Sequence, residues 1–253
     1  MQKRMSAVLI VVCLLSSSVF GLAPMGPSRA ELSQGQLSAG VEYSYTLMDV
    51  ELTHGLSPGG VTNFTMNGFK MNYVGAKIGH GCTDNIEGFI RLGGANARGD
   101  DTESGTAINF GGDNGFALGL GVKATLVEEV DIQWGCQFQI LWANGNGKAT
   151  LGGRNWDINI DVTEIQIAAG PSYKLRENVL LYGGPFFHYF DGHLKGDPRS
   201  GAAGTVKYDI DESANFGGYI GSQIDVAANT TLNIEYQHTS NADALGLNMT
   251  WKF

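Results

Sequence analysis

Two neighbouring stretches decide the fold: residues 116–126 read FALGLGVKATL, and residues 131–142 read DIQWGCQFQILW. In both, apolar residues alternate with polar or small ones, so the side chains of an extended chain would fall on opposite faces. The short link between them suits a turn. We therefore predict two adjacent antiparallel strands, each with one apolar and one polar face.

The same alternation recurs along the chain and predicts ten strands. They are expected at residues 41–47, 69–80, 87–95, 116–126, 131–142, 158–173, 179–190, 216–226, 232–237 and 245–253. The apolar parity changes within 158–173, which indicates either a β-bulge or a switch from an exposed extension to a membrane part near Thr163.

The connections alternate in length, with long ones at 51–68, 96–115, 143–157 and 191–215. Long and short loops at opposite ends, with no helix between strands, predict an up-and-down meander. Ten such strands are better closed than left with open edges. We predict an all-β, closed antiparallel barrel of about ten strands, with eight or twelve as alternatives.

Composition limits the class of protein. Charged residues make up 16% of the chain, and no run reaches the roughly 18 apolar residues that a membrane helix needs. With 43% apolar residues the chain is not disordered. The net charge of -9 disfavours nucleic-acid binding, which needs clustered basic residues.

The N-terminus is typical of a secretory signal peptide, because two basic residues precede the apolar run 7–15. We assign residues 1–30 to the signal peptide and 31–253 to the barrel. Cleavage after Gly21 or Ala23 also satisfies the small-residue rule. Cleavage after Ala30 is preferred.

Cysteine and histidine give no sign of a metal site, a cofactor or a disulfide. Cys82 falls in an expected turn and Cys136 in the middle of a strand, and the five histidines are scattered. We expect neither bound metal nor cofactor.

Periodicity alone does not say which face is wet, but the tryptophans favour a membrane barrel. Trp134 and Trp142 lie on one face and would span roughly 20 Å of a tilted strand, close to the outer-membrane apolar band. The polar face carries too many charges for a lipid-binding cavity. The lumen-facing charged residues are predicted to be Glu42, Arg91, Lys123, Asp131, Glu164, Asp225 and Glu235. The aromatic residues at the membrane interfaces are predicted to be Trp134, Trp142, Trp251 and Phe253.

The last expected strand has alternating apolar residues from Leu245 to Phe253, and this pattern is similar to that of a known family. The chain resembles bacterial outer-membrane β-barrel proteins of the porin-like and OmpA-like superfamily. This resemblance implies export to a Gram-negative outer membrane and contact with its lipid bilayer. It also implies recognition of the strand ending in Phe253 by the barrel-assembly machinery.

One feature is similar to ten-stranded outer-membrane proteases of the omptin type: Asp191 and His193 stand at the top of the seventh expected strand. That resemblance implies a second acidic pair, for which only Asp100 and Asp101 are available. These two are adjacent, and we expect the chain to be too short for tall strands. Both groups are therefore interpreted as solvated loop residues.

The expected function is non-enzymatic: a structural or small-solute porin-like barrel whose opposite charges pair across the lumen. An alternative is adhesion or surface recognition through the long loops 51–68, 96–115 and 191–215. An omptin-like protease is a further alternative.

Overall fold

The structure is a computed structural model and describes residues 22–57, 60–103, 106–113, 115–151, 154–199, 204–212 and 215–253. Within these residues the regular structure is entirely strand, and no helix is long and apolar enough to cross a membrane.

The described strands are β1 (Leu37–Ser57), β2 (Gly60–Thr83), β3 (Ile86–Glu103), β4 (Thr106–Gly112), β5 (Gly115–Glu128), β6 (Ile132–Leu151), β7 (Arg154–Arg176), β8 (Val179–Pro198), β9 (Val206–Asp211), β10 (Phe216–Ala227), β11 (Thr230–Thr239) and β12 (Ala242–Lys252). All pairings between them are antiparallel. β4 and β5 lie end to end between β3 and β6, and together they occupy one strand position of the barrel wall. β9 and β10 likewise lie end to end along β8.

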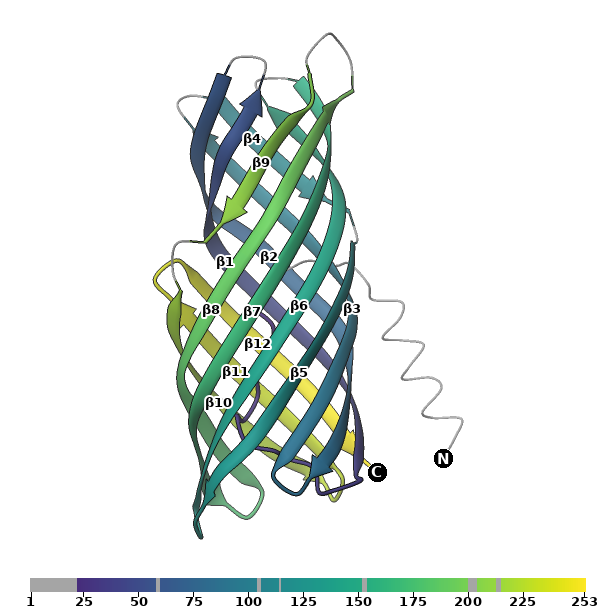
Figure 1. The fold of residues 1–253 in the computed structure, drawn as a ribbon, viewed down its shortest axis with the longest axis vertical. Coiled ribbons are helices and arrows are strands. Elements are labelled where there is room, and N and C mark those ends of the chain that lie inside the picture. Colours follow the sequence, from purple (N-terminus) through teal and green to yellow (C-terminus); the bar gives the residue numbers. More distant parts are fainter. Residues whose placement is uncertain are drawn as a thin grey trace.

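The end of the barrel with the short turns is a closed ring of ten strands; Figure 1 shows this end below. Hydrogen bonds run from β1 through β2, β3, β5, β6, β7, β8, β10, β11 and β12 and back to β1. The meander and the strand number predicted from the alternation are confirmed.

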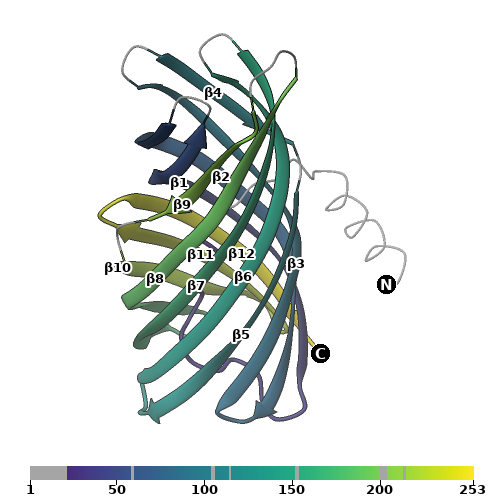
Figure 2. The same ribbon diagram turned by 45° about the horizontal axis from the view of Figure 1, so that its top comes forward.

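Above this ring the barrel continues as an extension with only eight strands. The hairpin of β11 and β12 stops at residues 239–242, and above it β9 pairs directly with β1, as in Glu51 with Asp211. Figure 2 shows the short hairpin at mid-height beside the taller strands. The extension therefore closes through β1, β2, β3, β4, β6, β7, β8 and β9.

The extension corrects the prediction of long loops. Most of residues 51–68, 96–115, 143–157 and 191–215 lie in strands, and β6 pairs with β7 without interruption from Ile132 to Leu151. The expectation that the chain is too short for tall strands is also wrong, since β2 has 24 residues.

The change of pattern near Thr163 is a switch of environment. Ile158, Ile160 and Val162 point inward, and so does Glu164, two residues on in the same register. Within β7 the pairing with β6 shows no bulge at this point. The interior is therefore apolar in the extension and polar in the ring. The outer face is polar in the extension and apolar in the ring.

The outer face of the ring carries a belt of exposed large apolar side chains. The belt includes Tyr45, Leu47, Ile78, Ile90, Leu92, Leu118, Leu120, Trp134, Trp142, Ile167, Leu181, Ile220, Ile234, Leu245 and Leu247. In the extension the apolar side chains are inside instead. Phe69 and Phe110 stack there with ring centroids 6.1 Å apart, among buried Leu52, Met66 and Ile158.

Candidate functional site: the barrel lumen

Five of the seven charged residues predicted to face the lumen are buried inside the ring. They are Glu42, Arg91, Lys123, Glu164 and Glu235. The interior also holds buried Lys77, Glu87, His188 and Glu212.

The prediction that Asp131 and Asp225 face the lumen is wrong. Asp131 is exposed in the turn between β5 and β6, where its carbonyl oxygen accepts a hydrogen bond from the Lys174 amide at 2.8 Å. Asp225 keeps the inward parity of β10 but lies beyond the packed interior, exposed at the rim. Alternation gives the face of a strand but not the height at which the lumen ends.

The lumen also contains a segment of the chain that precedes the first strand. Residues 22–36, which we call the luminal segment, run down the inside of the barrel to the end with the short turns (Figure 1). Leu22, Ala23 and Met25 are each only 1% exposed. At the rim the Gly35 amide donates to the Gly81 carbonyl oxygen at 2.8 Å. The part 22–30, assigned to the signal peptide from the sequence, is thus enclosed by the strands.

The upper part of the luminal segment is bound through its backbone. The two carboxylate oxygens of Glu235 accept hydrogen bonds from the amides of Met25 at 2.8 Å and Gly26 at 2.7 Å. The Ala23 carbonyl oxygen accepts from the side-chain amide of Gln237 at 2.9 Å. Buried backbone groups need such partners, and here the lumen wall supplies them.

The lower part is held by charge. The Glu31 carboxylate lies 3.4 Å from the Lys123 ammonium, and the Glu31 amide donates to Glu87 at 2.9 Å. Burial acts to raise the pKa of Glu31, but Lys123, Lys252 and other cations outweigh it and lower that pKa from 4.5 to about 2. Glu31 is therefore ionised at neutral pH and pairs with Lys123.

Glycines in the wall make room for the luminal segment. A Cβ atom on Gly135 would lie 2.5 Å from the Arg29 backbone nitrogen, and one on Gly81 would lie 2.0 Å from the Ser33 carbonyl oxygen. Both distances are shorter than side chains tolerate. The wall and the luminal segment thus fit one another at backbone level.

The expected pairing of opposite charges occurs inside the ring, but with other partners as well. Arg91 pairs with Glu42, with the guanidinium Nε 2.9 Å from the carboxylate. Glu164 faces His188, whose other ring nitrogen lies 2.6 Å from Glu212. These buried charges are paired, as the cost of an isolated buried charge demands, whereas the Lys77 ammonium lies over the Phe89 ring, 4.3 Å from its centroid.

Sequence reasoning did not find His188, Glu212 or Glu31. His188 lies in a stretch whose alternation is ambiguous in parity. Glu212 follows β9 directly, in a region that the sequence predicts as a loop, and Glu31 follows a run that resembles a leader peptide. The luminal segment has no periodicity, and Pro24 and Pro27 exclude it from a central strand. Glycines on the inward face of the wall, such as Gly81 and Gly135, are a sequence signal that would have indicated it.

The side chains of Asp191 and His193 lie outside the lumen. Phe190 and Gly192 point inward on β8, so Asp191 and His193 point outward, and His193 Nδ1 lies 3.0 Å from Asp209. Asp100 and Asp101 belong to β3, and β4, β6 and β7 separate them from β8. The side chains of these two aspartates are outside the described residues.

The aromatic residues predicted for the interfaces face outward. Trp134 and Trp142 are 49% and 40% exposed, and Phe253 is 63% exposed at the end of β12. Trp251 is half-buried, on the same outer face of β12. Among the described residues no cluster of histidine, cysteine and carboxylate side chains is arranged to hold a metal ion.

Comparison with known proteins agrees with this architecture. The family of the outer membrane protein beta-barrel domain matches residues 72–253. The chain belongs to this family. It is therefore an outer-membrane protein of Gram-negative bacteria, and its apolar belt contacts the lipid bilayer.

Solved barrels of the outer membrane are similar in fold. The outer membrane protease OmpT from Escherichia coli is 11% identical, with a TM-score of 0.54 over 92% of this chain and 99% of that one. The outer membrane protein OprG from Pseudomonas aeruginosa is 11% identical, with a TM-score of 0.48 over 87% of this chain and 97% of that one. No curated protein matches the chain. At 11% identity the likeness to OmpT is one of fold alone.

Proposed function

We propose that this protein is a non-enzymatic structural barrel of the outer membrane whose lumen is closed to solutes by its own luminal segment. The observation that carries the proposal is the binding of the segment's backbone amides by Glu235 inside the ring. Above the segment the apolar side chains of the extension fill the narrower tube. The polar lumen and the apolar core together leave the barrel without a continuous water path.

This proposal requires that residues 22–30 remain in the mature protein. We therefore place signal-peptide cleavage after Gly21, where Val19 stands three residues before the cut, as the small-residue rule allows. Intact-mass measurement of the protein purified from outer membranes should give a chain that begins at Leu22. A chain that begins at Glu31 would remove the plug from the mature barrel.

Planar-bilayer recordings test the closed lumen directly. The mature barrel should show conductance no higher than the lipid background. Because the apolar core of the extension still fills the tube above the segment, discrete openings should require a variant that joins residue 21 to Glu31 and also carries Phe110→Ala with Trp156→Ala in that core. Phe110→Ala with Trp156→Ala alone should stay closed. Gln34→Ala is the matched control, because its side chain is exposed and only its backbone amide bonds to Asp84. Steady conductance from the unaltered barrel would overturn the proposal.

The non-enzymatic part of the proposal is supported by the outward direction of Asp191 and His193. A protease of the omptin type needs its histidine and its acidic pairs around one cleft, whereas His193 pairs with Asp209 on the outer face. Incubation with a basic peptide should give no cleavage by the barrel or by His193→Ala. Cleavage that disappears in His193→Ala would establish the protease.

We also propose that β12 acts as the assembly signal. Its terminal Phe253 has an exposed ring, and its backbone amide bonds to the Leu37 carbonyl oxygen at 2.8 Å, next to the seam where β12 meets β1. Phe253→Ala should lower the amount of folded barrel in outer membranes, while refolding of the purified variant in detergent stays normal. Equal amounts in membranes would remove this role.

Surface recognition is a second candidate, favoured by the extension, which has a polar outer face and an apolar core of its own. Such a rigid tube displays its tips away from the membrane. Cells carrying the barrel should aggregate differently from cells carrying Asp157→Lys with Lys195→Glu, two exposed positions of the extension. Equal aggregation, with equal amounts of barrel, would leave only the structural role.

A further inference from the structure

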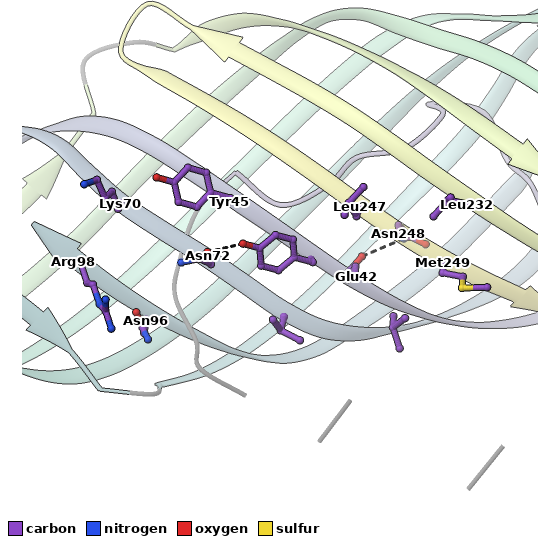
Figure 3. Close-up of a pocket in the computed structure, with 13 residues that line it drawn as sticks. Glu42, Tyr45, Lys70, Asn72, Asn96, Arg98, Leu232, Leu247, Asn248 and Met249 are labelled. Atoms are coloured by element: carbon purple, nitrogen blue, oxygen red, sulfur yellow. Dashed lines mark hydrogen bonds between the residues drawn. The ribbon is translucent and has the colours of Figure 1, made fainter. Parts of the chain in front are cut away.

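A groove crosses the outer face of the ring, independent of the lumen and of the luminal segment. It encloses about 660 Å³ between β11, β12, β1, β2 and β3. Figure 3 shows Lys70 and Arg98 at one end of it and Leu232 and Met249 at the other. Leu232 lies two residues beyond the short turn that precedes β11, so the cationic end faces the extracellular side.

The wall of the groove changes from apolar to charged along two neighbouring strands. On β2 the outward residues toward the extension are Val74, Asn72 and then Lys70. On β3, directly opposite these in register, they are Gly94, Asn96 and then Arg98. The cations stand where the apolar belt ends. This order matches a lipid with its tail in the belt and its headgroup at the outer interface.

Lys70 and Arg98 are opposite one another in register, and like charges so placed repel. Within the described part of the chain neither has an ion pair or a side-chain hydrogen bond. Among the outward carboxylates on or next to the neighbouring strands, Asp49 accepts from the Gly68 amide at 2.7 Å and Asp243 faces His238 at 2.8 Å. The exposed Glu51 and Asp113 form no ion pair with either cation within the described residues. The two cations are therefore left for an external anion.

We propose that this groove is a binding site for an acyl lipid of the outer leaflet that carries a phosphate group. The phosphate lies between Lys70 and Arg98, because a guanidinium and an ammonium are the usual partners of phosphate oxygens. Asn72 and Asn96, one step nearer the belt, supply amide donors, although Asn72 Oδ1 is already occupied by the Tyr43 hydroxyl at 2.7 Å. The acyl chain follows the groove past Val41 and Leu247.

The test uses the purified full barrel in detergent and native mass spectrometry with three probes. Dioleoyl phosphatidic acid carries the phosphate and the tails, dioleoylglycerol carries the tails alone, and inorganic phosphate carries the anion alone. Phosphatidic acid should bind at least tenfold more tightly than dioleoylglycerol. Inorganic phosphate at the same concentration should leave its binding unchanged.

Two double variants locate the site. Lys70→Gln with Arg98→Gln should weaken phosphatidic acid about tenfold and leave dioleoylglycerol unchanged. Lys148→Gln with Lys207→Gln removes the same charge from exposed positions of the extension and should change neither. Val74→Trp, which fills the middle of the groove, should weaken both lipids.

Three results would overturn the proposal. They are equal binding of phosphatidic acid and dioleoylglycerol, undiminished binding to Lys70→Gln with Arg98→Gln, and full competition by inorganic phosphate. The last would mean that the cations bind an anion without the groove. Heat-dependent electrophoretic mobility confirms that each variant is folded, so a loss of binding is read only from intact barrels.

Discussion

Replacing Glu235 by glutamine should release the luminal segment without unfolding the barrel. Glu235 binds two consecutive amides of the segment, those of Met25 and Gly26, with one carboxylate oxygen each. Glutamine keeps the size and one acceptor oxygen but replaces the other by an NH₂ group, which cannot accept. One amide in the lumen therefore loses its partner.

The size of the effect follows from these two bonds. A buried N–H left without a partner costs roughly 1–3 kcal/mol, and changing the remaining acceptor from charged to neutral costs about 1 kcal/mol more. The docked state is then weakened by about 2–4 kcal/mol. Since 1.4 kcal/mol is a factor of ten, the undocked population rises by about 30-fold or more.

Hydrogen–deuterium exchange of the Met25 and Gly26 amides measures this population, because exchange from a rarely open state scales with its occupancy. Both amides should exchange about 30-fold faster, or more, in Glu235→Gln, while the amides of β6 and β7 keep their rates. Glu129→Gln, in the exposed turn between β5 and β6, is the charge-matched control. Unchanged exchange at both amides would show that Glu235 does not hold the segment.

Three further predictions concern the same interior. Ile158→Ala in the extension core should lower the free energy of unfolding by roughly 2–5 kcal/mol in urea titrations, because the cavity it leaves has little room to collapse. Because the pKa of Glu31 is lowered from 4.5 to about 2, its ion pair with Lys123 stabilises docking of the segment fully above about pH 4.5. This contribution is lost as the pH falls toward 2. Hydrogen exchange of the segment's amides should therefore speed up over that interval, relative to the amides of β6 and after correction for the intrinsic rate. Gly135→Ala should displace Arg29 and speed up hydrogen–deuterium exchange of the Met25 and Gly26 amides, whereas unchanged exchange would show that the segment can shift without leaving the lumen.

Sequence reasoning predicted the ring because lipid outside and water-like surroundings inside impose a strict period of two. The pattern failed in the extension for a physical reason. On β6 the inward residues there are small, Ala143, Gly147 and Ala149, and they pack against large side chains such as Phe110 and Trp156 from neighbouring strands. A strand whose buried face is alanine and glycine shows no apolar alternation and is easily taken for a loop.

A shift of register in the β1–β2 hairpin also interrupts the alternation of apolar and polar residues. Between Met48 and Val50 of β1 the partner strand moves from Phe69 to Met66, and Gly68 there adopts a φ of 65°. A glycine-containing bulge of this kind shifts parity by local conformation, which alternation counted along one strand does not register. The Gly68 amide is bound by Asp49, which fixes the bulge.

The luminal segment was missed because strand patterns describe the wall of a barrel and not its contents. An eight-stranded barrel is just wide enough for its own side chains to fill, and the extension is filled in that way. The ten-stranded ring encloses more space, and its wall turns glycines such as Gly81 and Gly135 inward, which enlarges that space further. The interior of the ring must therefore be filled either by protein or by water. The barrel narrows from ten strands to eight at the β11–β12 hairpin, so only the part below this level needs the luminal segment to fill it. The segment ends near that level, with Leu22 beneath the apolar core.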